Sequence, residues 1–183
     1  EVVGRVACLI NHKANRTWNT HSARFGWIDF IDDLEVSRAL LDTAEAWARE
    51  YQCDKLIGPM GFTDLDAEGM LIEGFDQLST MSTIYNYPYY PKHLEAHGYE
   101  REIDWSERKI YVPRPGHEAD YERYFRVAEI VRKRSNLHIR KFKSVKEIKD
   151  GNYIYRLFDV INRSYAPLFG FSEINRRQID KYA

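Results

Sequence analysis

Asp29 is the acidic residue best placed for chemistry in this sequence. It lies in the segment Ser22–Phe30, where residue types alternate as in a half-buried strand. With a period of two, Asp29 shares a strand face with Trp27 and Ile31. A carboxylate in such apolar surroundings is a candidate general base. The alternative is a carboxylate on the solvent side of the strand, or one that accepts hydrogen bonds where the next helix begins.

A second group of carboxylates lies in the long segment Met60–Tyr87, which is rich in Gly, Asp, Ser and Thr. Loops of this length in a compact domain are usually functional or mobile. Glu68, Glu73 and Asp76 are the candidate residues, and Glu73 belongs to a Glu-Gly-Phe sequence typical of a shaped turn. The alternative is that all three are solvated loop residues.

Metal and nucleophile motifs are weak. His93 and His97 stand four positions apart on one expected helix, but no third ligand has a fitting spacing, so we expect no metal. Cys8 and Cys53 form neither a zinc pattern nor a redox pair, and we expect both thiols to be buried. The sequence also lacks a Gly-x-Ser-x-Gly nucleophile motif and a phosphate-binding loop.

Several elements must position these candidates. Val2–Asn11 is a β-branched run that predicts a strand, joined by turn residues to the strand Ser22–Phe30. Asp32-Asp33 then caps a helix over Leu34–Tyr51. Its apolar stripe should pack on a twisted mixed sheet through Leu41, Ala44 and Trp47. A short buried strand at Lys55–Gly58 and a short helix at Pro88–His97 follow.

The rest of the chain also alternates between element types. Tyr99–Val112 predicts one or two strands, and Glu118–Ser135 predicts a helix. Leu137–Phe142 predicts a strand, Val145 begins a helix after Ser144, and Tyr153–Tyr165 predicts another helix.

Composition indicates a globular protein. The chain has 183 residues, 44% of them hydrophobic, and a net charge of −1. Residues 1–112 hold 11 Lys/Arg against 19 Asp/Glu, whereas residues 113–183 hold 16 against 9. Apolar residues interrupt the basic stretch, so we expect a solvated face or an acidic partner within the chain rather than nucleic acid. No run is long and apolar enough for a membrane span, and we expect a cytoplasmic protein.

The order of these elements resembles the GCN5-related N-acetyltransferase fold from its second strand onward. The stretches that carry the resemblance are Gly4–Ala7, Phe25–Asp33, Ala39–Leu41 with Ala46–Ala48, Gly58-Pro59, Glu73–Asp76, and Tyr89-Tyr90 ahead of Leu94–Tyr99. Together they look like an uncharacterised bacterial group of tandem acetyltransferase-like proteins. The resemblance implies an α/β (α+β) fold with a mixed, mostly antiparallel twisted sheet flanked by helices.

In that superfamily, backbone N–H groups after the fourth strand hold the coenzyme A pyrophosphate at a helix N-terminus. The resemblance therefore implies cofactor contacts from the strand end and the first helical turns, namely Phe30, Ile31, Val36, Ser37 and Arg38. The expected glycines are missing, and Asp32, Asp33 and Glu35 bring negative charge to this position. We therefore expect no tight binding of acetyl-CoA to this chain, although acetyl-CoA or another acyl-CoA stays an expected cofactor of the full-length protein.

The resemblance also implies a tyrosine that protonates the leaving thiolate. Leu94 stands where the pattern has tyrosine, and Tyr89 and Tyr90, one turn earlier, are the substitutes. The alternative is that both aromatic rings only pack on the sheet. With Asp29 as base, they complete the expected catalytic set. Glu73, Phe75 and Asn86 are the residues expected to form the substrate loop.

The same resemblance divides the chain. Residues 1–112 match the later part of one acetyltransferase-like module, residues 113–136 would be a connecting helix, and residues 137–183 match the start of a second module. We expect the last segment to pack on the first, with Ile139, Phe158 and Ile161 buried at the junction. The chain would then be a piece of a longer protein.

The expected function of that protein is N-acyl or aminoacyl transfer from a thioester or related donor to a small-molecule or peptide amine. A homodimer is compatible with the charge asymmetry, and neither nucleic acid nor membrane is expected as a partner. The alternative is a non-catalytic module that binds a peptide or small molecule on a relic of the fold.

Overall fold

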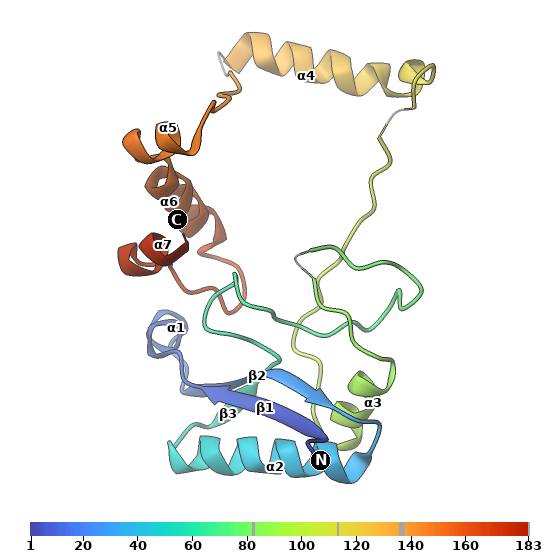
Figure 1. The fold of residues 1–183 in the computed structure, drawn as a ribbon, viewed down its shortest axis with the longest axis vertical. Coiled ribbons are helices and arrows are strands. Elements are labelled where there is room, and N and C mark those ends of the chain that lie inside the picture. Colours follow the sequence, from blue (N-terminus) through green and yellow to red (C-terminus); the bar gives the residue numbers. More distant parts are fainter. Residues whose placement is uncertain (82, 113, 136–137, 183) are drawn as a thin grey trace. The chain divides into compact units, whose positions relative to one another are not determined.

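The computed structural model describes residues 1–81, 83–112, 114–135 and 138–182 (Figure 1). The fold is mixed α/β, with a three-stranded sheet flanked by helices. The chain divides into two compact units. Unit 1 comprises Glu1–Ile103 and Ile154–Ala183, and unit 2 comprises Asp104–Tyr153. Within the described ranges, no helix has the length and apolar character needed to cross a membrane.

The sheet of unit 1 has β2 at its centre. Strands β1 (Gly4–Leu9) and β2 (Ser22–Phe30) are antiparallel, whereas β3 (Lys55–Ile57) runs parallel to β2. The parallel pairing covers only Ser22 to Arg24 of β2. One further backbone bond, from the Met60 N–H to the Phe25 carbonyl at 2.8 Å, extends it. The end of β2 therefore runs on without β3 beside it.

A bulge changes which side chains of β2 face the core. Arg5 pairs with Asp29 and Ala7 pairs with Gly26, so two residues of β2 lie opposite one residue of β1. Trp27, inside the bulge, has a left-handed φ of 47°. Phe25 and Phe30 are an odd number of positions apart, yet both enter the same buried cluster. The extra residue is what places them on one face.

Helix α2 (Leu34–Glu50) covers one face of this sheet (Figure 1). Asp33 caps it, since the side-chain oxygen accepts a hydrogen bond from the Glu35 N–H at 2.8 Å. Its buried Leu41 and Ala44 pack with Phe25 and Phe30, as the apolar stripe predicted. Helix α3 (Tyr89–Ala96) adds Tyr90 and Leu94 to the same cluster, and Trp47 is half-buried.

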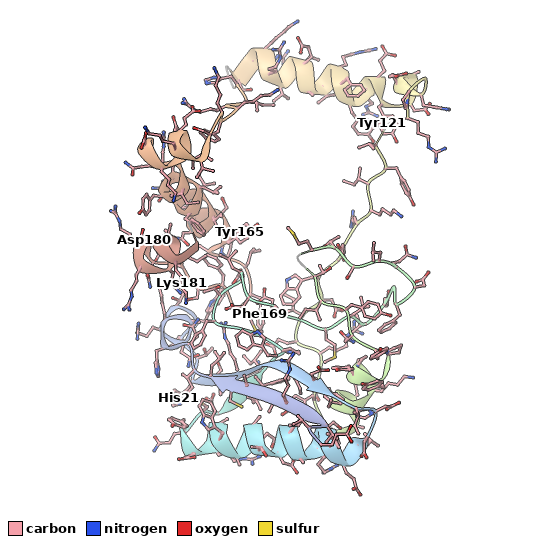
Figure 2. The ribbon with its side chains drawn as sticks, viewed as in Figure 1. His21, Tyr121, Tyr165, Phe169, Asp180 and Lys181 are labelled. Carbon is pink, nitrogen blue, oxygen red and sulfur yellow. The ribbon has the colours of Figure 1, made fainter. Side chains whose placement is uncertain are left out.

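The C-terminal part of unit 1 packs on the other side of β2. Helices α6 (Tyr153–Tyr165) and α7 (Arg176–Tyr182) bury Phe158, Ile174 and Ile179 in a small cluster of their own. The Arg24 guanidinium donates to the Gly170 carbonyl at 2.8 Å, and the Trp18 indole N–H donates to the Phe171 carbonyl at 3.0 Å. Phe169 lies on the side of the sheet that α2 leaves uncovered (Figure 2).

Unit 2 contains a 3-10 turn (Glu118–Tyr121) and helices α4 (Glu122–Ser135) and α5 (Val145–Asp150). None of these elements has a buried residue. Ile139, expected at a buried junction, is 89% exposed, so that expectation is wrong, whereas Phe158 is buried. The module boundaries near residues 112 and 137 stay a prediction.

Three sequence-based assignments are wrong. Residues 99–112 form no strand, and neither do the described residues 138–142; Leu137 lies outside the described residues. Alternation alone cannot make a strand, because its backbone groups need a neighbouring strand. The third wrong assignment is the turn between β1 and β2, because this segment contains helix α1 (His12–Trp18). Asn11 caps the helix, since its side-chain oxygen accepts a hydrogen bond from the Ala14 N–H at 2.9 Å.

Candidate functional site

Asp29 and Tyr90 meet at the end of β2. The Tyr90 hydroxyl donates a short hydrogen bond to the Asp29 carboxylate and accepts one from the Phe30 N–H at 3.3 Å. Burial and this bond to Asp29 raise the pKa of Tyr90. Asp29 itself is exposed, as are Trp27 and Ile31, so the apolar surroundings expected for it are absent. An accessible carboxylate thus accepts a hydrogen bond from a buried phenol.

Tyr89 lies beside this pair. Its hydroxyl donates to the Phe30 carbonyl at 2.6 Å, and its ring packs on those of Tyr87, Tyr90 and His93. Burial is the largest cause that raises the pKa of Tyr89, and the charges of Asp32 and Asp29 add to it. All three expected catalytic residues therefore come together, but both tyrosines hold their protons firmly and already use their hydroxyls.

A buried polar chain links α2 to α3 next to these tyrosines. The Asp32 carboxylate lies 2.9 Å from His93 Nε2, and His93 Nδ1 lies 2.9 Å from the Ser37 hydroxyl. The same hydroxyl lies 2.8 Å from His97 Nε2. Sequence reasoning missed this chain. Its signal was Ser37, a polar residue on the stripe of Leu41 that faces the sheet.

The residues expected to hold a coenzyme do not form an anion site. Ser37 is fully buried, and its hydroxyl is occupied by the two histidines. At the start of α2, the Asp33 carboxylate already accepts a hydrogen bond from the Glu35 N–H. Phe30, Ile31, Val36 and Arg38 lie around this acidic end, where the carboxylates of Asp32, Asp33 and Glu35 repel phosphate. That coenzyme A does not bind tightly at this end of α2 stays a prediction.

The expected substrate loop is held by Asn86. Its side chain accepts from the Leu71 N–H at 2.6 Å and donates to the Leu71 carbonyl at 3.1 Å, so it closes the loop like a strand pair. The Tyr85 hydroxyl donates to the Phe75 carbonyl at 3.0 Å. Glu73 is exposed at the turn. Asn86 is thus a scaffold of the loop, and Phe75 contributes its backbone.

A second charged cluster lies on the other face of β2. Arg24, only 5% exposed, donates to the Gly61 carbonyl at 2.9 Å as well as to Gly170. Burial first, and then the charges of Asp64 and Asp66, raise the pKa of Glu68 to about 7 against the opposing effect of Arg24. Sequence reasoning listed Glu68 but missed Arg24, whose signal was a cation inside a strand expected to be half-buried.

Metal and thiol chemistry find no support in the described ranges of the chain. There, no group of three or more His, Cys, Asp or Glu could hold a metal ion. Cys8 and Cys53 are unpaired and half-buried rather than fully buried, and burial raises the pKa of both thiols.

One curated protein resembles the chain in sequence. Protein YghO of Escherichia coli (strain K12) is 34% identical over 112 residues, which is 59% of this chain and 29% of YghO. The match thus spans less than a third of that relative. The chain matches no family model, and no solved structure matches it. We therefore infer the function of the whole protein from the site and from the sequence resemblance.

Proposed function

We propose that this chain is part of an acetyltransferase-like protein and supplies the acceptor side of N-acyl or aminoacyl transfer. The proposal joins the sequence resemblance to a geometric feature. β2 and β3 are parallel, with α2 between them in the chain, and the pairing ends near Arg24 while β2 continues to Phe30. In the resembled fold, the catalytic carboxylates lie on such a splayed strand.

The observation that carries the proposal is the contact between Tyr90 of α3 and Asp29 at the end of β2, which pairs with β1 but extends beyond β3. Asp29 is exposed, and its carboxylate is oriented by the buried Tyr90 hydroxyl. Tyr90 is itself fixed by the Phe30 N–H. A fixed, accessible carboxylate is what a general base requires. Tyr90 then acts as a positioning residue and not as an acid, because it already donates its proton to Asp29 and its raised pKa makes it a weaker acid.

Acyl transfer joins the nitrogen of the acceptor amine to the acyl carbon, releases the leaving group of the donor and frees one proton from the nitrogen. In our proposal Asp29 accepts that proton. The amine belongs to a small molecule or a peptide. Because the carboxylates of Asp32, Asp33 and Glu35 disfavour a pyrophosphate at the start of α2, an acyl-CoA or related donor is proposed only for the whole protein, outside this end of α2.

A second function is favoured by the blocked start of α2. Asp33 takes the Glu35 N–H, and both proposed tyrosine acids are engaged. A module that binds a peptide or small molecule without catalysis would need none of these groups free. Both proposals share a cytoplasmic protein without nucleic acid or membrane partners, and both allow a homodimer.

The experiment is an acyl-transfer assay on the full-length protein with acetyl-CoA and a panel of amines. Asp29→Asn keeps an oxygen for the Tyr90 hydroxyl but cannot take a proton at neutral pH. We expect it to lower kcat/KM by about 100-fold or more. Asp54→Asn, at an exposed carboxylate just before β3, is the control and should match the parent. Transfer that survives Asp29→Asn unchanged would refute Asp29 as base, whereas no transfer but measurable amine binding would favour the binding module.

A further inference from the structure

Ser37 is the centre of the buried chain between α2 and α3, and its hydroxyl has more neighbours than protons. Its oxygen lies 3.2 Å from the Leu34 carbonyl, 2.9 Å from His93 Nδ1 and 2.8 Å from His97 Nε2. The residue is fully buried, so water cannot supply a further partner. A hydroxyl donates one proton and accepts at two lone pairs. Only one of the three neighbours can receive the Ser37 proton at any time.

His97 can be assigned first. Its Nδ1 is buried and has no hydrogen-bond partner among the described residues. An unpaired buried N–H costs more than an unpaired lone pair, so the ring proton belongs on Nε2. Burial is the largest cause that lowers the pKa of His97, and the charges of Arg38 and His93 add to it, against a small opposing effect of Asp42. His97 is then a neutral donor to the Ser37 oxygen.

His93 can keep its hydrogen bonds in two protonation states. Its Nε2 faces the Asp32 carboxylate at 2.9 Å and must carry a proton to bond it. When Nδ1 is bare, it accepts the Ser37 proton. When Nδ1 is protonated, it donates to the Ser37 oxygen, and the Ser37 proton turns to the Leu34 carbonyl. Every polar atom between Asp32 and Ser37 is satisfied in both states.

We propose that Ser37 is a two-position hydroxyl switch that lets the α2–α3 contact accept or release a proton at His93 without losing a hydrogen bond. The proton gained or lost is the one on Nδ1, which faces Ser37, while Nε2 keeps its proton and its bond to the largely exposed Asp32 carboxylate in both states. The charged or titratable groups that face the switch are Asp32, Arg38 and Asp42 from the α2 side, and Tyr89 and His97 from α3. The inference does not depend on the proposed function.

The position of the switch gives it a consequence. The ring of His93 stacks on Phe30 with centroids 5.4 Å apart, and on Tyr89 at the same separation. Phe30 is the residue whose backbone both tyrosine hydroxyls bond. A charge gained at His93 therefore forms beside the tyrosines that hold the end of β2.

The test is a pH titration of the 183-residue chain by NMR, with spectra that report the protonation of each histidine ring nitrogen. We expect His97 to stay protonated on Nε2 only, while its signals shift in step with the titration of His93. The exposed His21 is the internal control and should titrate independently. A proton on His97 Nδ1, or His97 signals that ignore His93, would overturn the switch.

Two variants separate coupling from mere contact. Asp32→Asn weakens the protonated state of His93, so the shift at His97 should move to lower pH. Asp32 is exposed, and this variant should fold. Ser37→Ala should reduce the coupled shift at His97 to what the direct His93–His97 ring contact and charge transmit, and it should leave the signals of His21 unchanged. Undiminished coupling in folded Ser37→Ala, or no movement in Asp32→Asn, would contradict the proposal. Neither readout requires acyl transfer, so the switch and the proposed function can fail separately.

Discussion

Phe25 and Arg24 are neighbours on β2, yet their side chains lie on opposite faces of the sheet and meet different surroundings. Phe25 is fully buried against Leu41 and Ala44 of α2. Arg24 is almost as buried, but it donates to two carbonyls and lies in the field of Glu68. At Phe25 the α2 face thus rests on apolar packing, and its charged groups lie at the end near Asp32 and His93, whereas the other face buries the Arg24 guanidinium in the middle of the strand.

The two faces should therefore differ in how strongly their contribution to stability depends on pH. Apolar burial changes little with pH, but a buried ionisable group makes stability depend on it. Each substitution below changes one face and leaves the other intact.

Phe25→Ala should have the largest effect. Deleting a fully buried ring removes its transfer free energy and leaves a cavity, so we expect the free energy of unfolding to fall by about 3–5 kcal/mol. Denaturant unfolding measures it. Leu34→Ala, at a side chain that is 51% exposed, is the control and should cost less than about 1 kcal/mol. Equal losses in both variants would mean that the α2 face is not the main core.

Arg24→Met should cost somewhat less. The methionine keeps apolar volume but leaves the Gly61 and Gly170 carbonyls without their charged donor, which costs about 2–3 kcal/mol. Because Gly170 lies in the C-terminal segment, proteolysis within residues 168–174 should also become faster. Arg38→Met, on the surface of α2, is the matched control. If the Arg24 variant unfolds like the parent, the second face contributes packing alone.

Glu68→Gln should remove a pH dependence. The folded-state pKa of Glu68, about 7, is above its ordinary value of 4.5, so the folded protein binds the proton more tightly. The stability from this group is fully present below pH 4.5 and is lost as pH rises through 7. After allowance for solvent screening, the loss is about 1–2 kcal/mol.

Urea unfolding at pH 5 and pH 8 measures that loss. Glu68→Gln should be less sensitive than the parent to this change in pH, and it should be the more stable protein at pH 8. Glu73→Gln, at an exposed carboxylate of the same loop, should behave like the parent. Identical pH profiles for the parent and Glu68→Gln would rule out a buried proton on this face.

Local signals predicted much of the first hundred residues. The Asp33 cap and the stripe through Leu41 and Ala44 identified α2, a β-branched run located β1, and alternation located β2. The same alternation failed at residues 99–112, because a strand needs a partner that local pattern does not reveal. The bulge at Trp27 was also invisible, and it decides that Asp29 faces solvent.

The candidate site was predicted in part. Asp29, Tyr89 and Tyr90 were named from sequence, and the structure brings them together. Ser37 was expected to contact a coenzyme but lies in the interior, because it shares the buried stripe of Leu41. Tertiary contacts across 56 and 60 positions join it to His93 and His97, and no local pattern encodes such pairings.

We propose that this chain binds the acceptor amine of acyl transfer near Asp29 and does not bind the acyl donor at the start of α2. Calorimetric titration of acetyl-CoA into the 183-residue chain tests it most directly. The account predicts no binding with a Kd below about 1 mM, because Asp33 takes the Glu35 N–H and three carboxylates repel phosphate. Submillimolar binding that is lost in Val36→Pro, a variant without the Val36 N–H, would mean that coenzyme A binds at the start of α2 and would refute the proposal.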